Sequence, residues 1–144
     1  MSAQPSSPSY THPVRVYWED TDAGGVVFYA NYLKFFERAR TEWLRSLGFG
    51  QQEMLERHGV LFVVGQVHIR YVKSAKLDDA LHITASVAEV GRSRLAIAQQ
   101  ALRGGDLLAH GTVDIVCVQQ ATWRAQRVPS EILERMTPCF NPRP

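Results

Sequence analysis

Cysteines and long apolar runs are scarce in this sequence. Its two cysteines, Cys117 and Cys139, lack the Cys-x-x-Cys spacing of zinc and redox motifs. Free cysteine in an apolar run packs as a small hydrophobe, so we expect two reduced, structural thiols. No segment approaches the roughly 20 apolar residues of a membrane-spanning helix, and the N-terminus lacks the basic start and apolar stretch of a secretory signal. We therefore expect a cytoplasmic protein that does not insert into a membrane.

The sequence also lacks a large excess of either positive or negative charge. Lys and Arg number 16 and Asp and Glu number 14, which gives a formal net charge of +2. This balance produces no field of one sign across the surface, so we expect no nucleic-acid partner. Of the 16 cations 13 are Arg, a residue suited to paired recognition of phosphate or carboxylate. GC-rich codon usage produces the same bias and is the favoured explanation.

Several familiar catalytic motifs are missing. The sequence has no Gly-x-Ser-x-Gly, Gly-x-Gly-x-x-Gly or P-loop, which argues against an α/β-type serine hydrolase, nucleotide redox chemistry and phosphoryl transfer. The five histidines lack the close spacing of metal ligands. An Asp-x-Asp-x-Gly run starts at Asp20, but Gly24 and Asn31 occupy positions where a calcium loop needs a carboxylate and a glutamate. We expect no metal site and no cofactor.

The length of 144 residues suits one globular domain. Residues 1–12 are rich in Ser and Pro, and residues 138–144 hold three prolines, which oppose regular structure. We therefore expect a disordered N-terminal tail over 1–12, a single domain over 13–137 and a Pro-rich C-terminal tail over 138–144.

The first half of the domain predicts a strand and one long helix. Apart from Arg15, residues 14–18 are β-branched or aromatic, and they favour a first strand that runs into an acidic, glycine-bearing turn. Over residues 31–47, apolar residues recur at steps of three and four, which is typical of an amphipathic helix. Asn31 is a candidate N-cap of this helix, and Gly48 is a candidate terminator.

The second half changes its period from 3.6 to 2, which predicts half-buried strands. Apolar and polar residues alternate in four segments, 67–71, 81–87, 95–99 and 109–117. Turn residues at 91–92 and 104–106 favour tight connections and an antiparallel meander, whose apolar face the helix would cover. Pro129 and the residues up to Met136 predict a short final helix. The expected fold class is α+β.

The segment from Glu19 to Tyr29 combines carboxylates, paired glycines and an apolar stretch just before the long helix. Carboxylates act as general bases or nucleophiles, and glycines allow close backbone approach to a ligand. A helix N-terminus adds unpaired N–H groups with partial positive charge, which stabilise an oxyanion. On composition alone, an ordinary cap or turn explains the same residues better.

The run VYWEDTDAGGVVFYANYLKFFERARTEWL resembles the active-site signature of the 4-hydroxybenzoyl-CoA thioesterase-like hotdog superfamily. Within that superfamily, the continuation LFVVGQVHIRYVKSAKLDD is similar to the bacterial acyl-CoA thioesterases associated with the Tol-Pal system. The resemblance covers residues 13–128. It implies a hotdog fold, in which an antiparallel sheet of about five strands wraps around a long central helix, and it implies hydrolysis of an acyl-CoA thioester to free acid and CoA.

The resemblance also implies which residues carry the chemistry. The family's catalytic aspartate matches Asp22, as nucleophile or general base, whereas Asp20 takes a supporting structural role. Main-chain N–H groups that polarise the thioester carbonyl match three positions, Val27, Phe28 and Tyr29. Many relatives in the Tol-Pal-associated group carry His at the position of Tyr29, and a phenol does not replace that imidazole as a base at neutral pH. Tyr also occurs at this position in the superfamily, where the main-chain N–H polarises the carbonyl, so the resemblance still implies that role for the Tyr29 N–H.

Substrate-binding residues are implied at two further places. Gly24 and Gly25 would let the substrate approach the backbone closely. Arg92 and Arg94 match a strand-turn region that contributes basic CoA contacts in related hotdog enzymes, although exposed turn arginines are commonly only solvated.

The resemblance implies a homodimer, or a tetramer of dimers, because related hotdog domains join their sheets across edge strands and form active sites at the interface. One alternative function stays open. The protein could bind an acyl-CoA or acyl-carrier protein, or act as a scaffold for lipid-synthesis or envelope partners, with little turnover. The retention of Asp22 beside two glycines favours the enzyme.

Overall fold

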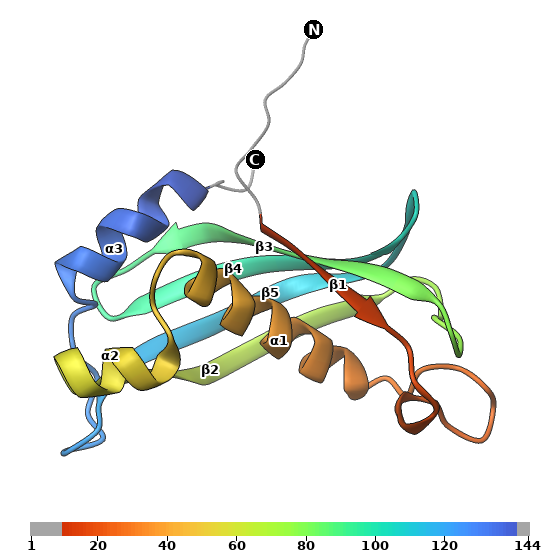
Figure 1. The fold of residues 1–144 in the computed structure, drawn as a ribbon, viewed down its shortest axis with the longest axis horizontal. Helices are drawn as coiled ribbons and strands as arrows, with labels where there is room; N and C mark the ends of the chain where they lie inside the picture. Colours follow the sequence, from red (N-terminus) through yellow and green to blue (C-terminus); the bar gives the residue numbers. More distant parts are fainter. Residues whose placement is uncertain (1–9, 141–144) are drawn as a thin grey trace, which may run out of the picture.

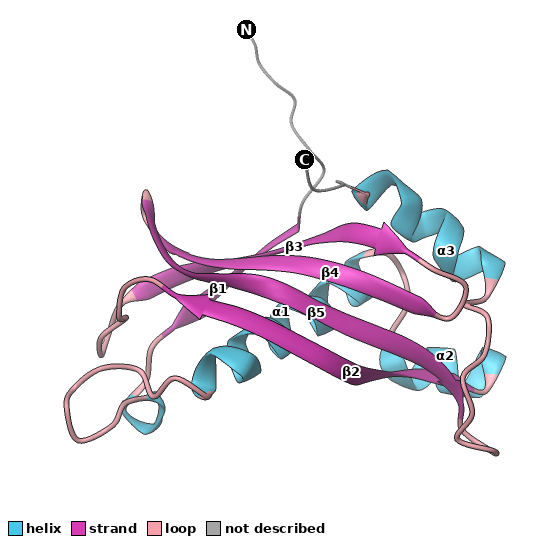
Figure 2. Cartoon of the chain, turned by 180° about the vertical axis from the view of Figure 1, so that it is seen from behind, coloured by secondary structure: helices cyan, strands magenta, loops and turns pink. Residues whose placement is uncertain are grey.

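The computed structural model describes residues 10–140, which form an antiparallel sheet of five strands with helices on one face (Figure 1). Helix α1 (Asn31–Ser46) runs across the concave side of the sheet, and the view from behind shows the opposite side free of helices (Figure 2). The predicted α+β class and hotdog fold are confirmed. The strands are β1 (Tyr10–Arg15), β2 (Val60–Tyr71), β3 (Ala80–Val90), β4 (Arg94–Arg103) and β5 (Asp106–Gln119).

The order of strands in the sheet is β1-β3-β4-β5-β2. Only β3, β4 and β5 form a meander, with tight connections where the turn residues predicted them; Gly104 there has a φ of +60°. The prediction that four consecutive strands form one meander is wrong at its first step. Strand β2 pairs with β5, so the segment 72–79 crosses from one side of the sheet to β3 instead of forming a hairpin.

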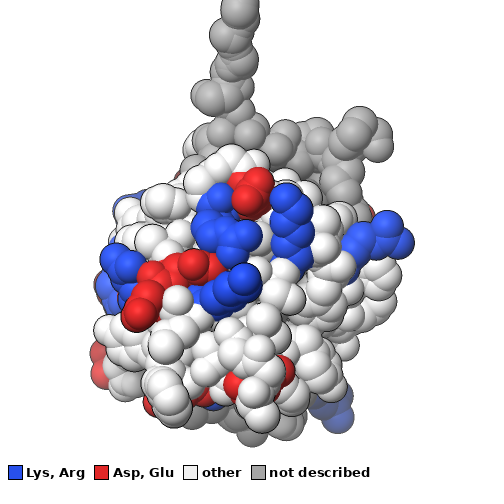
Figure 3. Space-filling view, turned by 90° about the vertical axis from the view of Figure 1, so that its right-hand side faces the viewer, with Lys and Arg blue, Asp and Glu red and all other residues white. Residues whose placement is uncertain are grey.

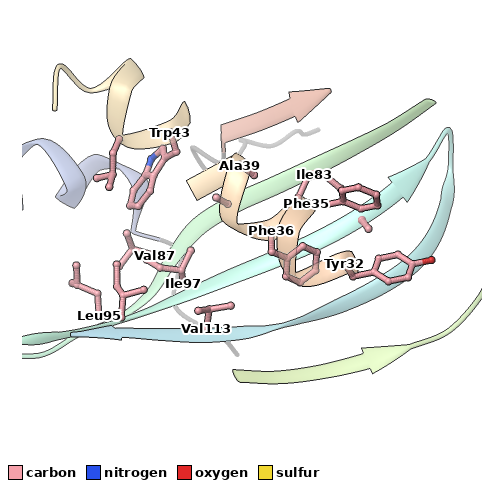
Figure 4. Close-up of a cluster of buried hydrophobic side chains, with 14 of the residues drawn as sticks. Tyr32, Phe35, Phe36, Ala39, Trp43, Ile83, Val87, Leu95, Ile97 and Val113 are labelled. Carbon is pink, nitrogen blue, oxygen red and sulfur yellow. The ribbon is translucent and has the colours of Figure 1, made fainter. Parts of the chain in front are cut away.

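Helix α1 buries its apolar stripe against the sheet, as the periodicity predicted. The rings of Phe35, Phe36 and Trp43 are almost wholly buried and meet aliphatic side chains of β3, β4 and β5 (Figure 4). Each such side chain contributes roughly 1.5–3 kcal/mol when it leaves water. The helix ends before Gly48, whose φ of +96° suits the left-handed termination that glycine permits. The N–H of Phe49 donates to the carbonyl of Leu44 at 2.9 Å and closes this end.

One polar side chain lies inside the core beneath α1. The Gln99 amide of β4 is 1% exposed; its Nε2 donates to the carbonyl of Phe36 at 3.0 Å, and its Oε1 accepts from Arg40 at 2.9 Å. Burial lowers the pKa of the Arg40 guanidinium, which nevertheless keeps its charge in proteins. These bonds satisfy an amide that would otherwise destabilise the core.

Both ends of the domain extend further than predicted. Residues 10–12 belong to β1 and pair with β3, and Phe140 forms a bridge with Val87, so neither predicted tail boundary is correct. The first strand ends at Arg15, and Trp18 lies instead in a 3-10 turn, Trp18–Asp20. The remaining tails lie outside the described residues.

The remaining helices pack near the C-terminal end of α1. Helix α3 (Ser130–Met136) confirms the predicted final helix, whereas α2 (Gln51–His58) was not predicted; a second 3-10 turn covers Thr137–Cys139. None of the helices described is long and apolar enough to cross a membrane.

We expect Cys117 to be chemically inert in the folded protein. Its side chain is fully buried, and burial raises the pKa of the thiol to about 11, so almost no thiolate exists at pH 8. In the wild type the Trp43 N–H donates to the Cys139 sulfur at 3.3 Å. A Cys139→Ser variant keeps an acceptor at this place, the serine oxygen. In that variant, a chromogenic disulfide reagent should react with no thiol at pH 8 until denaturant is added. Immediate labelling of the native variant would contradict the assignment.

Candidate active site

Asp22 lies in a tight turn between the 3-10 turn at Trp18–Asp20 and α1. Its backbone is fixed on both sides, because the Gly25 N–H donates to the Asp22 carbonyl at 3.0 Å and the Asp22 N–H donates to the Val26 carbonyl at 2.9 Å. Gly25 adopts a φ of +81°, a conformation that glycine takes without strain. The side chain of Asp22 is exposed, and its Oδ1 accepts from the Gly24 N–H at 2.8 Å. One carboxylate oxygen therefore stays available to a ligand.

The neighbouring acid, Asp20, has a different environment. It is 5% exposed, and its Oδ2 accepts from the Tyr17 N–H at 2.8 Å. Its carbonyl accepts two further bonds, from the Phe28 N–H at 3.0 Å and from the Asn31 Nδ2 at 2.8 Å. Asp20 thus ties the loop to the start of α1. Asn31 makes this bond instead of capping the helix with its side chain, which corrects the prediction of Asn31 as N-cap.

The backbone amides before α1 are not equivalent. The N–H of Val27 donates to the Ala75 carbonyl at 2.8 Å, and that of Phe28 donates to the Asp20 carbonyl. Within residues 10–140, the N–H groups of Tyr29 and Ala30 meet no acceptor. This corrects the predicted set of three donors. The N–H groups of Val27 and Phe28 already donate to protein carbonyls, so the Tyr29 N–H is the available donor of the three. The positive end of the α1 dipole lies at this point.

A pocket of about 190 Å³ adjoins Tyr29, and the rings of Tyr29, Tyr32 and Tyr71 line it together with Lys73. Tyr29 and Tyr71 meet edge to face, with ring centroids 6.1 Å apart, and the Tyr71 hydroxyl donates to the Tyr29 carbonyl at 3.1 Å. Burial raises the pKa of both Tyr32 and Tyr71, so neither phenol is ionised near neutral pH. The pocket is therefore aromatic and uncharged apart from Lys73.

Charges of both signs gather on part of the end of the molecule that carries the Asp22 turn. Figure 3 shows this end, with acidic and basic side chains side by side in one region and mostly uncharged surface below it. Arg103 contacts Asp79 at 2.8 Å, and Lys73 contacts Asp106 at 3.5 Å. Burial acts to raise the pKa of Asp79, but hydrogen bonds from Arg103 and from the Lys76 N–H outweigh it and hold that pKa below its usual value. At this end of the molecule, the basic side chains of Arg103 and Lys73 are thus paired with carboxylates.

The two predicted CoA-binding arginines do not share a site. Arg94 makes ion pairs with Glu89 at 3.2 Å and Asp114 at 3.1 Å on the outer face of the sheet. Arg92 lines a separate groove of about 730 Å³ with Arg124 and Arg127. The sequence reasoning missed the latter two because they lie in an irregular segment after β5; their only signal was the density of arginines around residue 125.

Neither arginine lies near Asp22 in the same chain. The Asp22 turn contacts the segment just before β3, where Val26 bridges to Lys76, whereas Arg92 follows the far end of that strand. Strand β3 has 11 residues, which at about 3.3 Å per residue separates its ends by roughly 30 Å. Within residues 10–140, no cluster of His, Cys, Asp or Glu side chains is placed to hold a metal ion.

The protein has a hotdog fold in which the exposed Asp22 carboxylate lies in the loop that precedes α1. Residues 16–136 match the thioesterase-like superfamily, and the chain belongs to this family. It is 46% identical over 123 residues to the acyl-CoA thioesterase YbgC of Haemophilus influenzae, covering 85% of this chain and 90% of that protein.

Two further comparisons agree. The acyl-CoA thioester hydrolase YbgC of Escherichia coli O6:H1 is 40% identical over 122 residues, which cover 84% of this chain and 90% of that protein. The crystal structure of a probable thioesterase from Bartonella henselae superposes with a TM-score of 0.79 at 32% identity, covering 84% of this chain and 99% of the other.

Proposed function

We propose that this protein is an acyl-CoA thioesterase that hydrolyses the thioester to a free acid and CoA, with Asp22 as the catalytic carboxylate. The names of its relatives support the substrate class. The observation that carries the proposal is the exposed Asp22 carboxylate, held by the Gly24 N–H at 2.8 Å in a turn that leads to the unpaired Tyr29 amide. A free carboxylate oxygen and a free N–H on one short segment suit attack on a carbonyl.

Two routes use the same atoms. In one, Asp22 removes a proton from water, the hydroxide oxygen bonds to the thioester carbon, and the carbon–sulfur bond breaks as the thiolate takes a proton. In the other, the carboxylate bonds to that carbon, the thiolate leaves, and water then hydrolyses the mixed anhydride. In both, the carbonyl oxygen gains negative charge that the Tyr29 N–H stabilises. One such donor lowers the barrier by about 3 kcal/mol in comparable sites.

The turn glycines complete the proposed site. A Cβ at Gly24 would lie 3.2 Å from the Asp22 Oδ1 and would crowd the carboxylate. Nothing lies within 4 Å of a Cβ at Gly25, so its role is the positive φ of the turn. Both glycines thus keep the space and the backbone path that present Asp22 to the substrate.

We further propose that the protein assembles through β2, as a dimer or a tetramer of dimers. The outer edge of β2 is 12 residues long and contains no proline, whereas β1, at the other edge, contains Pro13, which cannot donate to a neighbouring strand. Val64 and Val67 on β2 are 50% and 39% exposed. An unprotected, partly apolar edge favours pairing with a second copy.

Antiparallel pairing of two β2 strands would complete the site. Val60, at the start of β2, pairs with Gln119 beside the Arg92 groove, whereas Tyr71, at its end, contacts Tyr29 beside the Asp22 turn. A twofold axis through β2 would therefore bring the groove of one copy to the Asp22 turn of the other. Arg94, already paired with two carboxylates, has no part in this arrangement.

Sedimentation velocity tests the assembly. We expect a dimer or tetramer at micromolar concentration and no active monomer, because one chain places Arg92 and Asp22 at opposite ends of the sheet. A stable monomer that hydrolyses acyl-CoA at the full rate would refute the shared site. A cytoplasmic location stays a prediction from the sequence, an acyl-carrier-protein partner stays a prediction as well, and a link to the Tol-Pal system stays a prediction from resemblance.

A further inference from the structure

The two peptide groups that flank Tyr29 are not held equally well by the backbone. The preceding one is fixed, because the Asn31 N–H donates to the Phe28 carbonyl at 2.8 Å. The following one has a long helical bond, since the Tyr32 N–H lies 3.4 Å from the Tyr29 carbonyl, beyond the usual range of about 2.7–3.2 Å. The Tyr29 side chain is 63% exposed and anchors the residue little. A single orientation of Tyr29 therefore depends on another donor to its carbonyl.

Tyr71, the last residue of β2, supplies that donor. Its hydroxyl donates to the Tyr29 carbonyl at 3.1 Å. Its ring meets the Tyr29 ring edge to face and also packs on the ring of Tyr32, with centroids 5.5 Å apart. These two ring contacts hold the phenol in place. Burial raises the pKa of the Tyr71 phenol, so the hydroxyl keeps its proton and stays a donor near neutral pH.

The segment that follows β2 holds the same stretch of chain on both sides of Tyr29. The Val27 N–H donates to the Ala75 carbonyl at 2.8 Å, and the Ala75 N–H donates to the Tyr32 hydroxyl at 3.1 Å. These bonds fix the chain before and after Tyr29 but do not involve its own peptide groups. The Tyr71 hydroxyl thus completes a set of contacts that fixes the start of α1 on the end of β2.

We propose that Tyr71 is a positioning residue for thioester hydrolysis, whose hydroxyl holds the Tyr29 carbonyl and so keeps the Tyr29 N–H aimed at the substrate carbonyl oxygen. The inference rests on the proposed function, because it needs the Tyr29 N–H as the oxyanion donor. Such a donor is effective only when it points at the place where negative charge develops. The Tyr71 hydroxyl itself transfers no proton in this role.

The pocket beside this bond explains why water would not replace the hydroxyl. Tyr29 and Tyr71 both line the pocket of about 190 Å³. An acyl group seated there would cover the bond and exclude water from it. In the complex, a Tyr29 carbonyl that has lost the phenol would therefore keep only the long bond from Tyr32.

Tyr71→Phe tests the proposal, because it removes the hydroxyl and keeps the ring contacts. We expect kcat for acyl-CoA to fall about tenfold, a part of the roughly hundredfold or larger loss that removal of a whole oxyanion donor causes. KM should stay unchanged, since the carbonyl oxygen gains its charge only in the transition state. Tyr10→Phe is the matched control; it removes a phenol hydroxyl from β1, at the opposite edge of the sheet, and should keep the wild-type kcat. Both variants should melt within about 2 °C of the wild type.

A spectroscopic readout follows the substrate carbonyl without turnover. The probe is an acyl-CoA analogue in which a methylene group replaces the thioester sulfur, with carbon-13 at the ketone carbon. Hydrogen bonds to the ketone oxygen move this resonance downfield. We expect a downfield shift when the wild type or Tyr10→Phe binds the probe, and loss of at least half of that shift in Tyr71→Phe.

The outcomes separate the two proposals. An unchanged kcat, a rise in KM alone, or a full downfield shift in Tyr71→Phe would overturn the positioning role of Tyr71 and leave Asp22 and the Tyr29 N–H in place. A wild-type protein that binds the probe without any downfield shift would instead refute the Tyr29 N–H as the oxyanion donor. Absence of acyl-CoA hydrolysis by the wild type would refute the proposed function as a whole.

Discussion

An Asp22→Asn variant should lose at least about a thousandfold in thioester hydrolysis and keep its fold. Asparagine neither attacks a carbonyl nor removes a proton from water, so either route through the carboxylate is closed. The fold should survive because the side chain is exposed and its one hydrogen bond, from the Gly24 N–H, can be accepted equally by an amide oxygen. Release of CoA thiol measures the rate, and the thermal midpoint should stay within about 2 °C of the wild type.

Asp78 offers the matched control for this experiment. It is an exposed acid at the same end of the molecule, and its φ of +72° suits asparagine. We expect Asp78→Asn to hydrolyse acyl-CoA at the wild-type rate. Wild-type turnover by Asp22→Asn would remove Asp22 from the mechanism, and a wild-type protein that binds acyl-CoA without releasing thiol would favour the scaffold alternative.

Gly111→Ala should destabilise the protein by about 3 kcal/mol or more. A Cβ at this position in β5 would lie 2.1 Å from the His68 carbonyl oxygen and 2.9 Å from the Ile69 Cα, both in the backbone of β2. Backbone atoms cannot rotate aside as a flexible side chain can, so β2 and β5 would have to separate locally. Urea denaturation should show the loss as a lower midpoint.

Gly105→Ala is the comparison for this substitution, since nothing lies within 4 Å of a Cβ there. We expect its free energy of unfolding to stay within about 0.5 kcal/mol of the wild type. Because β2 is also the proposed assembly edge, Gly111→Ala should weaken self-association as well. Equal stability of the two variants would mean that the close approach of β2 and β5 is not as described.

The long helix could be predicted from the sequence, but the place of β2 could not. The pattern over residues 31–47 is local, because three- and four-residue steps define one face whatever the rest of the chain does. The alternation in β2 marks a strand equally well, yet it does not say which strand is the neighbour. Pairing of β2 with β5 closes about 50 residues of chain, and only the packed sheet determines it.

The candidate site could likewise be predicted only in part from the sequence. Asp22 followed from the resemblance of residues 13–128, and its exposed position in a glycine turn is compatible with that prediction. The sequence could not show which backbone N–H is free, because this depends on contacts far along the chain. The Val27 N–H, for example, donates to the Ala75 carbonyl. Arg124 and Arg127 left no periodic pattern, because they lie in an irregular segment after β5.

The buried amide beneath α1 has a consequence for the geometry around Asp22. The bond from the Gln99 Nε2 to the carbonyl of Phe36 depends on the rotation and axial position of the helix. Sliding or turning α1 would leave that amide without its hydrogen bond in an apolar interior, at a cost of about 1–3 kcal/mol. The bond thus fixes the position of the helix, and of its amino end, relative to the middle of β4. A substitution at Gln99 would act on the reaction by letting the helix shift relative to the turn that carries the carboxylate.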